Sequence, residues 1–221
     1  SADISPTAGQ MPRLVGLAQA SKVYRQQEAL KSNPAFEKFT NGGNEVAFGT
    51  IGDASTSEGP FWESINAAGV LQVPMVMSVW DDGYGISVPR ELQTTKGSIS
   101  DALSGMQRTA DKPGYEIFVT KGWDYAHLCE TYEKAVKLAR EEHIPVLVHV
   151  KEVNQPQGHS TSGSHERYKS AERLEWETTF DCIQKFKEWV LSFEAKGMPI
   201  ATEEELNTIQ AAAKEMVRNS K

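Results

Sequence analysis

The stretch EVAFGTIGDASTSEGP, residues 45–60, decides the fold prediction. Its first seven residues form an apolar run, which predicts a buried strand. Gly52 and Asp53 then predict a sharp turn, and the residues that follow open a helix that extends to about Leu71. A strand that passes through a tight turn into a helix is the beginning of an alternating strand–helix architecture.

The same alternation continues along the chain. Three further apolar runs predict strands at 74–80, 115–119 and 144–150. Helices are predicted at 12–24, 57–71, 99–106, 124–142, 174–196 and 203–219. Because the strands are nearly continuous apolar runs that alternate with helices, we expect an α/β fold, a parallel sheet with helices on both faces. Residues 1–170 are expected to form this domain, and residues 171–221 a C-terminal helical extension.

Composition excludes several classes of protein. With 39% hydrophobic and 24% charged residues, the 221-residue chain is typical of a globular domain and not of a disordered segment. A net charge of −7 argues against a nucleic-acid partner. No apolar run approaches the roughly 20 residues of a membrane helix, so a soluble protein is expected. Cys129 and Cys182 form no recognisable pattern, which favours a reducing compartment, the cytoplasm, and argues against a cysteine metal site.

Two acidic turns follow neighbouring predicted strands. Free N–H groups at the first turn attract a phosphate, and the Asp53 carboxylate at that turn would repel it unless a divalent cation lay between them. The second turn offers the Asp82 carboxylate and the Tyr84 carbonyl, and oxygen donors of this kind suit Mg²⁺ or Ca²⁺. Ligands of parallel sheets bind beyond the carboxyl ends of the strands, where both turns lie. The alternative is two solvated acidic turns.

A third segment carries a histidine. His159 lies in the polar, Gly- and Ser-rich loop 154–168, where it can donate a hydrogen bond to a diphosphate or carry a proton. On its own, a loop histidine is more often an exposed side chain that has no function.

Four motifs in chain order then point to one family. Residues 4–12, ISPTAGQMP, are similar to ISSPLATQxP, and Gly52-Asp53 is similar to the GDG that opens the thiamine-diphosphate motif. Residues 82–87, DGYGIS, are similar to NGYAIS, and 158–162, GHSTS, to the HHSTSDD loop. Over nearly its whole length the chain resembles the alpha subunit, or the alpha-like half of a fused chain, of the thiamine-diphosphate-dependent decarboxylating dehydrogenase component of 2-oxo acid dehydrogenase complexes, of pyruvate or branched-chain type.

The resemblance implies a metal site. It implies the thiamine diphosphate-binding fold for residues 1–170, which would lack part of the family's N-terminal segment. Asp53 and Asp82 would bind Mg²⁺ through their carboxylates, and Tyr84 would bind it through its carbonyl oxygen. Asp82 stands where the family usually has Asn, and Trp80 where many relatives have an arginine that contacts the diphosphate.

The resemblance also implies a set of cofactor contacts. The residues concerned are Ser5, Thr7, Gly52, Asp53, Ala54, Ser55, Asp82, Tyr84, Ile86 and His159. Ala54 and Ser55 would present N–H groups to the diphosphate, and Ser5 and Thr7 would line the aminopyrimidine pocket. Ile86 would hold the cofactor bent. His159 would be the catalytic residue, in a loop expected to be disordered or displaced without cofactor.

The implied cofactors are thiamine diphosphate and Mg²⁺, with K⁺ in some family members. The implied partners are a pyrimidine-binding beta subunit or fused second half, and a lipoyl acyltransferase. A homo- or hetero-oligomer is expected, with neither nucleic acid nor membrane as partner, and the chain alone is expected to be inactive. The sequence leaves two alternatives open: a transketolase-like thiamine diphosphate enzyme, and a non-catalytic cofactor-domain remnant that serves as an assembly subunit.

Overall fold

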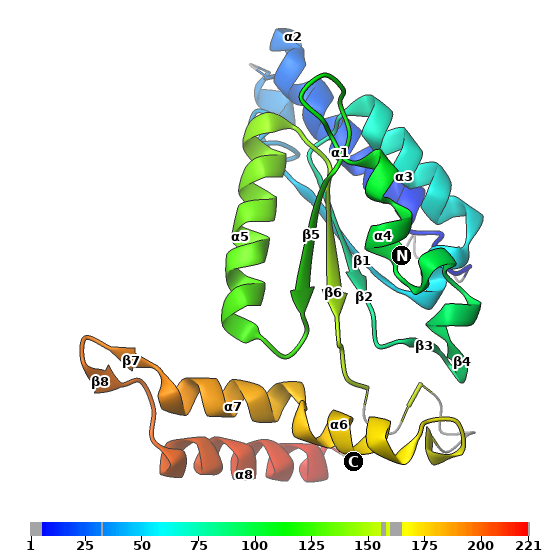
Figure 1. Cartoon of the computed structure of the whole chain (residues 1–221). Helices are drawn as coiled ribbons and strands as arrows, with labels where there is room; N and C mark the ends of the chain where they lie inside the picture. The colour runs from blue at the N-terminus through cyan, green and yellow to red at the C-terminus, as the bar shows by residue number, and fades with distance from the viewer. Residues whose placement is uncertain (1–5, 32, 156–157, 160–164, 221) are drawn as a thin grey trace.

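A four-stranded parallel sheet forms the centre of the protein. The computed structural model describes residues 6–31, 33–155, 158–159 and 165–220 (Figure 1). In sheet order the strands are β1 (Ala47–Gly52), β2 (Met75–Trp80), β6 (Val146–Lys151) and β5 (Glu116–Lys121). All three strand pairs are parallel. The predicted parallel sheet is therefore confirmed, and each predicted strand lies within one to two residues of the observed one.

Helices cover both faces of this sheet. The main helices are α1 (Met11–Gln26), α3 (Gly59–Leu71) and α5 (Tyr125–Glu142). Because side chains alternate along a strand, Met77 of β2 packs with α1 and α3, whereas Val76 packs with Ala135 and Ala139 of α5. Figure 1 shows α5 on one side of the sheet and α1 and α3 on the other. The predicted α/β architecture is confirmed by these two separate apolar clusters.

The remaining elements are short or lie at the C-terminal end. They are α2 (Glu28–Lys31), β3 (Tyr84–Gly85), β4 (Val88–Pro89), α4 (Ile99–Ala102), α6 (Ala171–Thr179), α7 (Cys182–Ser192), β7 (Glu194–Ala195), β8 (Met198–Pro199) and α8 (Glu203–Asn219). Short 3-10 turns occur at Pro34–Phe36, Ala54–Ser57, Arg90–Leu92, Thr95–Gly97, Ser104–Met106 and His165–Arg167.

Two predicted helices differ from the structure. The helix expected at 174–196 is two helices, because Asp181 caps a new one by accepting a hydrogen bond from the Gln184 N–H at 2.9 Å. The helix expected at 99–106 ends as α4 after a single turn and continues as a 3-10 turn. The last helix, α8, begins with the capping box of Thr202 and Glu205 that its sequence predicts.

The C-terminal helices lie beyond the carboxyl ends of the strands (Figure 1). They contact the sheet domain directly, since Arg173 of α6 donates to the Asp82 carbonyl and Asn154 donates to the Glu177 carbonyl. A division of the chain at residue 170 stays a prediction. Within the described ranges, no helix combines the length and apolarity needed to cross a bilayer.

Gly16 is expected to lower the stability of α1, although no close contact at this position requires a glycine. Gly16 lies exposed in the middle of α1, and a Cβ built on it meets no atom within 4 Å. Gly16→Ala is therefore expected to raise the free energy of unfolding by roughly 0.5–1 kcal/mol, because alanine loses less backbone entropy in a helix. Denaturant unfolding checks this, and an unchanged or lower free energy would contradict it.

Candidate functional site

Sheet pairing brings the two acidic turns together. β1 and β2 are neighbours with Gly52 opposite Trp80, and the Asp53 N–H donates to the Trp80 carbonyl at 3.0 Å, one residue beyond the strand. On the other side of β2, the Asp81 N–H donates to the Val150 carbonyl at 2.8 Å. The turn that carries Asp82 is thus held between the ends of β1 and β6.

Both predicted carboxylates are buried and incompletely bonded. Asp53 is 5% exposed and Asp82 is 7% exposed. The Tyr84 N–H donates to Asp82 Oδ1 at 3.1 Å. Among the described residues, neither Oδ2 receives a hydrogen bond, although His159 Nε2 lies 3.3 Å from that of Asp82, an ion-pair distance. Buried carboxylate oxygens without donors are rare, and a cation is one partner that satisfies them.

The charges of the site act on one another. Burial, together with the negative charges of Asp81 and Asp82, raises the pKa of Asp53 to about 7. Burial also raises the pKa of Asp82, against the lowering effect of the Tyr84 N–H and of the nearby His159, Lys169 and Arg173. Because ionisation of both carboxyl groups is opposed in this way, a cation bound between them would stabilise their charged forms.

Asp53, Asp82 and His159 line one cavity of about 550 Å³. Its walls are formed by Thr7, Gly52, Asp53, Ala54, Ser55, Trp80, Asp82, Tyr84, Gly85, Ile86, Gln93, Val153, Gln155 and His159. The cavity therefore brings together every predicted cofactor-binding residue except Ser5, which lies outside the described residues. The Ser160–Ser164 segment of the histidine loop also lies outside them, so the expected disorder of that loop stays a prediction.

Some of the cavity walls were not predicted from the sequence. Gly85 lies inside the DGYGIS motif, which marks it, but Gln93, Val153 and Gln155 carry no sequence signal that distinguishes them from other loop residues. Trp80 is half-exposed at the cavity, and its Nε1 donates to Ser78 Oγ at 2.9 Å. The indole therefore offers an apolar wall at a place where the family resemblance implies an arginine side chain.

Ile86 is strained at the cavity wall. Its φ is +59°, the left-handed region that β-branched residues avoid, and its side chain is 62% exposed. Such strain is typical of binding sites, where the backbone is held for a ligand and not for the fold. An exposed isoleucine in this conformation provides an apolar surface for a ligand that enters the cavity.

Helix α6 supplies positive charge behind Asp82. Arg173 Nη2 donates to the Asp82 carbonyl at 2.7 Å, and both Arg173 Nε and the buried Lys169 Nζ donate to Glu177 at 2.8 Å. Helix α6 thus holds the turn at 81–84 through Arg173. These residues were not predicted as part of the site.

The side chains present form only part of a metal site. In the described part of the chain, no group of three or more His, Cys, Asp or Glu side chains is arranged to hold a metal ion. Asp53 and Asp82 supply two open oxygens, so a bound cation would need further oxygens from a ligand. A magnesium ion that bridges the protein and a diphosphate fits this donor set.

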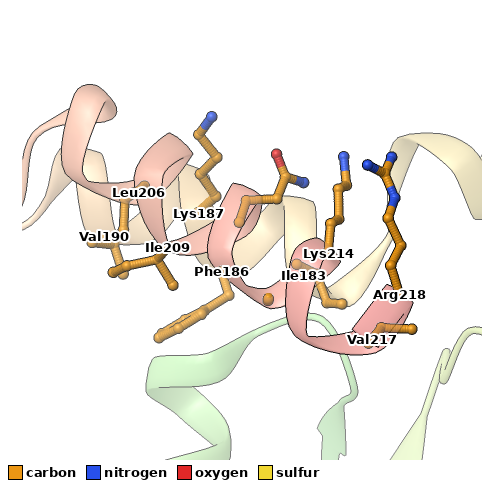
Figure 2. Close-up of a pocket in the computed structure, with 11 residues that line it drawn as sticks. Ile183, Phe186, Lys187, Val190, Leu206, Ile209, Lys214, Val217 and Arg218 are labelled. Atoms are coloured by element: carbon orange, nitrogen blue, oxygen red, sulfur yellow. The ribbon is translucent and has the colours of Figure 1, made fainter. Parts of the chain in front are cut away.

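A second cavity, of about 620 Å³, lies between α7 and α8 (Figure 2). Its walls are mainly aliphatic, and Lys187, Lys214 and Arg218 are the charged residues that line it. No carboxylate, histidine or cysteine of the described residues lines it, whereas Asp53, Asp82 and His159 line the first cavity.

Comparison with known proteins identifies the family. The model of the family described as "Dehydrogenase E1 component" matches residues 3–220. This chain belongs to that family. The match covers both the sheet domain and the C-terminal helices, so all the residues that line the first cavity lie within it.

Two curated relatives show the range of similarity within the dehydrogenase E1 component family. The pyruvate dehydrogenase E1 component subunit alpha of Rickettsia bellii is 26% identical over 188 residues, which is 84% of this chain and 53% of the relative. The mitochondrial 2-oxoisovalerate dehydrogenase subunit alpha 1 of Arabidopsis thaliana is 25% identical over 218 residues, 95% of this chain and 41% of the relative. This E1 component chain therefore spans about half the length of the curated relatives it matches.

Among solved structures, a transketolase from Campylobacter jejuni superposes with a TM-score of 0.48. It is 14% identical, and the match covers 85% of this chain and 33% of that one.

Proposed function

We propose that this chain is the diphosphate-binding part of a thiamine-diphosphate-dependent 2-oxo acid dehydrogenase. The whole enzyme would decarboxylate a 2-oxo acid and transfer the acyl group to a lipoyl group of an acyltransferase partner. The observation that carries the proposal is the pair of buried carboxylates, each with an open oxygen, in a cavity at the carboxyl ends of β1 and β2. Family membership and the alpha-subunit names of the relatives support the same function.

The chain's task would be to bind and orient the cofactor. Asp53 and Asp82 would hold Mg²⁺ with the Tyr84 carbonyl, and the N–H groups of Ala54 and Ser55 would bind the diphosphate. When bound, thiamine diphosphate supplies the electron sink that decarboxylation of a 2-oxo acid requires. A cofactor anchored at one end by a metal clamp is held in one orientation, which lowers the entropic cost of reaction.

Other residues would shape the rest of the cavity. Thr7 and Ile86 would contact the rings of the cofactor, and Ser5 would join them. His159, beside Asp82, would donate a hydrogen bond on the diphosphate side and move protons in later steps. K⁺ binding near residues 4–12 also remains part of the proposal; of these residues, Ile4 and Ser5 lie outside the described ones.

The proposed partners follow from membership of the dehydrogenase E1 component family. We propose that a pyrimidine-binding beta subunit or fused second half completes the active site in an oligomer. The glutamate that activates the aminopyrimidine would belong to that part, so the chain alone would not turn over substrate. Cys129 and Cys182 are unpaired, which supports the cytoplasmic location that we propose.

Isothermal titration calorimetry tests the proposed function. Thiamine diphosphate added to the chain in Mg²⁺ is expected to bind with one-to-one stoichiometry, and the same titration in EDTA is expected to give no saturable heat. Thiamine without phosphate serves as the control ligand and should not bind, because the clamp acts on the diphosphate. Absence of binding in Mg²⁺ both by the chain alone and by the chain with its beta partner, or equal binding in EDTA, would overturn the proposal and favour a non-catalytic assembly role.

A further inference from the structure

A histidine in the centre of the sheet has no role in the proposed function. His149 lies on β6 and is fully buried, on the face where its neighbour Leu147 joins the apolar cluster with α1 and α3. For packing on a buried strand, an aliphatic side chain would serve better than an imidazole. Burying an imidazole is costly unless its polar atoms are bonded, so its partners explain why it is there.

Both ring nitrogens of His149 are bonded. Nδ1 lies 2.9 Å from Ser100 Oγ, and Nε2 lies 2.9 Å from Asp81 Oδ2. Ser100 in turn lies 3.2 Å from Ser98 Oγ, the side chain that caps α4. Since a carboxylate only accepts, Nε2–H donates to Asp81 whether the ring is neutral or charged. A continuous series of buried hydrogen bonds thus joins α4 to the Asp81 carboxylate, which is next to Asp82 in the turn.

Asp81 differs from Asp82 in having no open oxygen. Its Oδ1 accepts from the Gly83 N–H at 2.9 Å, and its Oδ2 accepts from Arg90 Nη1 at 3.1 Å as well as from His149. Both oxygens of Asp81 are therefore bonded within the protein, which leaves neither of them open to a ligand.

The Asp81–Gly83 bond closes the turn that presents the site. Gly83 has a φ of +85°, which glycine adopts freely, and its carbonyl accepts from the Arg90 N–H at 3.0 Å. With this turn closed, Asp82 and Tyr84 both line the cavity, and Oδ2 of Asp82 accepts no hydrogen bond from any described residue. Any rotation of the Asp81 carboxylate would release the Gly83 N–H and with it the turn.

We propose that His149, held by Ser100, is a positioning residue that locks the Asp81 carboxylate and so fixes the turn that carries Asp82 and Tyr84. The inference deepens the proposed function, because the turn it fixes is the one assigned to Mg²⁺ and the diphosphate. Partners of this indirect kind change metal affinity by about 10- to 100-fold in other proteins. His149 does not touch the ligand, so its effect is transmitted through Asp81.

The first test needs no ligand. Hydrogen–deuterium exchange of the 80–90 segment is measured for the wild-type chain, His149→Leu and His149→Gln. His149→Leu removes the donor to Asp81, and the segment is expected to exchange at least tenfold faster. Gln has an amide nitrogen near the position of Nε2, so His149→Gln is expected to stay within about threefold of wild type.

Two further variants separate positioning from general stability. Val148→Ala removes core volume from the same strand without touching the chain of hydrogen bonds, and should leave exchange at 80–90 unchanged relative to other segments. Ser100→Ala leaves His149 in place but removes its second partner, and should speed exchange two- to fivefold. If His149→Leu does not fold, Ser100→Ala still tests whether His149 positions the turn.

The second readout is Mg²⁺-dependent affinity for thiamine diphosphate. A loss of at least tenfold is expected for His149→Leu, with near wild-type affinity for His149→Gln and Val148→Ala. If the wild-type chain does not bind the cofactor even with its beta partner, the proposed function fails, while the exchange data still decide whether His149 positions the turn. Unchanged exchange in both His149→Leu and Ser100→Ala, or an equal effect of Val148→Ala, would overturn the inference.

Discussion

Asp53→Asn is expected to stabilise the ligand-free protein at pH 8 and to lower its Mg²⁺-dependent affinity for thiamine diphosphate at least tenfold. The pKa of Asp53 is raised from 3.8 to about 7 by burial and by the charges of Asp81 and Asp82. Above that pH the wild-type protein holds a buried charge that faces others of the same sign. The amide removes this repulsion, but it also removes the charge that attracts the cation.

The sign of the pH dependence follows from linkage. Between about pH 4 and 7 the folded protein keeps a proton on Asp53 that the unfolded chain has lost, so wild-type stability falls as pH rises through this window. The stabilisation by Asp53→Asn should therefore be largest at pH 8 and shrink towards pH 5. Cation affinity of the wild type should rise over the same range, because the ion displaces the proton.

Thermal unfolding at pH 5, 6.5 and 8, with calorimetry in Mg²⁺, checks both parts. Asp111→Asn is the matched control, because Asp111 is exposed in the loop before β5. This substitution changes the net charge by the same amount as Asp53→Asn. If Asp53→Asn is less stable than wild type at pH 8, the repulsion between the carboxylates is not significant. If it binds the cofactor as well as wild type does, Asp53 is not a ligand.

Gly85→Ala is expected to damage the site more than the fold. A Cβ on Gly85 would lie 2.7 Å from Ala54 Cβ and 2.5 Å from Gln93 Oε1. The Gln93 side chain can move aside, but Ala54 is fixed by the turn after β1, so β3 must shift away from it. We expect a stability loss of about 1–3 kcal/mol, typical of overpacking, and at least a tenfold loss of cofactor affinity.

The control for this variant is Gly105→Ala, where a Cβ meets nothing within 4 Å. Denaturant unfolding and calorimetry on the two variants separate stability from binding. A Gly85→Ala protein that binds the cofactor normally would mean that the approach of β3 to Ala54 does not shape the cavity.

Much of the fold was predictable because its signals are local. β2 and β6 are buried along almost their entire length, so their apolar runs identify them and their parallel pairing. The break between α6 and α7 depends on one capping carboxylate, Asp181, within a pattern that otherwise continues as a helix. Such a cap is decided by a single hydrogen bond, which periodicity does not reveal.

The site was predictable where residues follow strand ends or belong to motifs. Asp53 and Asp82 come together because β1 and β2 are neighbours and parallel. The contacts of His149 were not predictable, since Asp81 and Ser100 are 68 and 49 residues away in sequence. They meet only because β6 lies beside β2 in the sheet and α4 packs on the same face, and sheet order is not encoded in any one segment.

An anomalous-scattering map of crystals grown with Mn²⁺ and thiamine diphosphate tests the metal clamp most directly. Mn²⁺ replaces Mg²⁺ at oxygen-rich sites, and we expect one strong peak about 2 Å from carboxylate oxygens of both Asp53 and Asp82. The Tyr84 carbonyl and the diphosphate should complete its coordination. Cofactor bound without a metal peak between these two carboxylates, or a peak elsewhere on the protein, would contradict the proposed clamp.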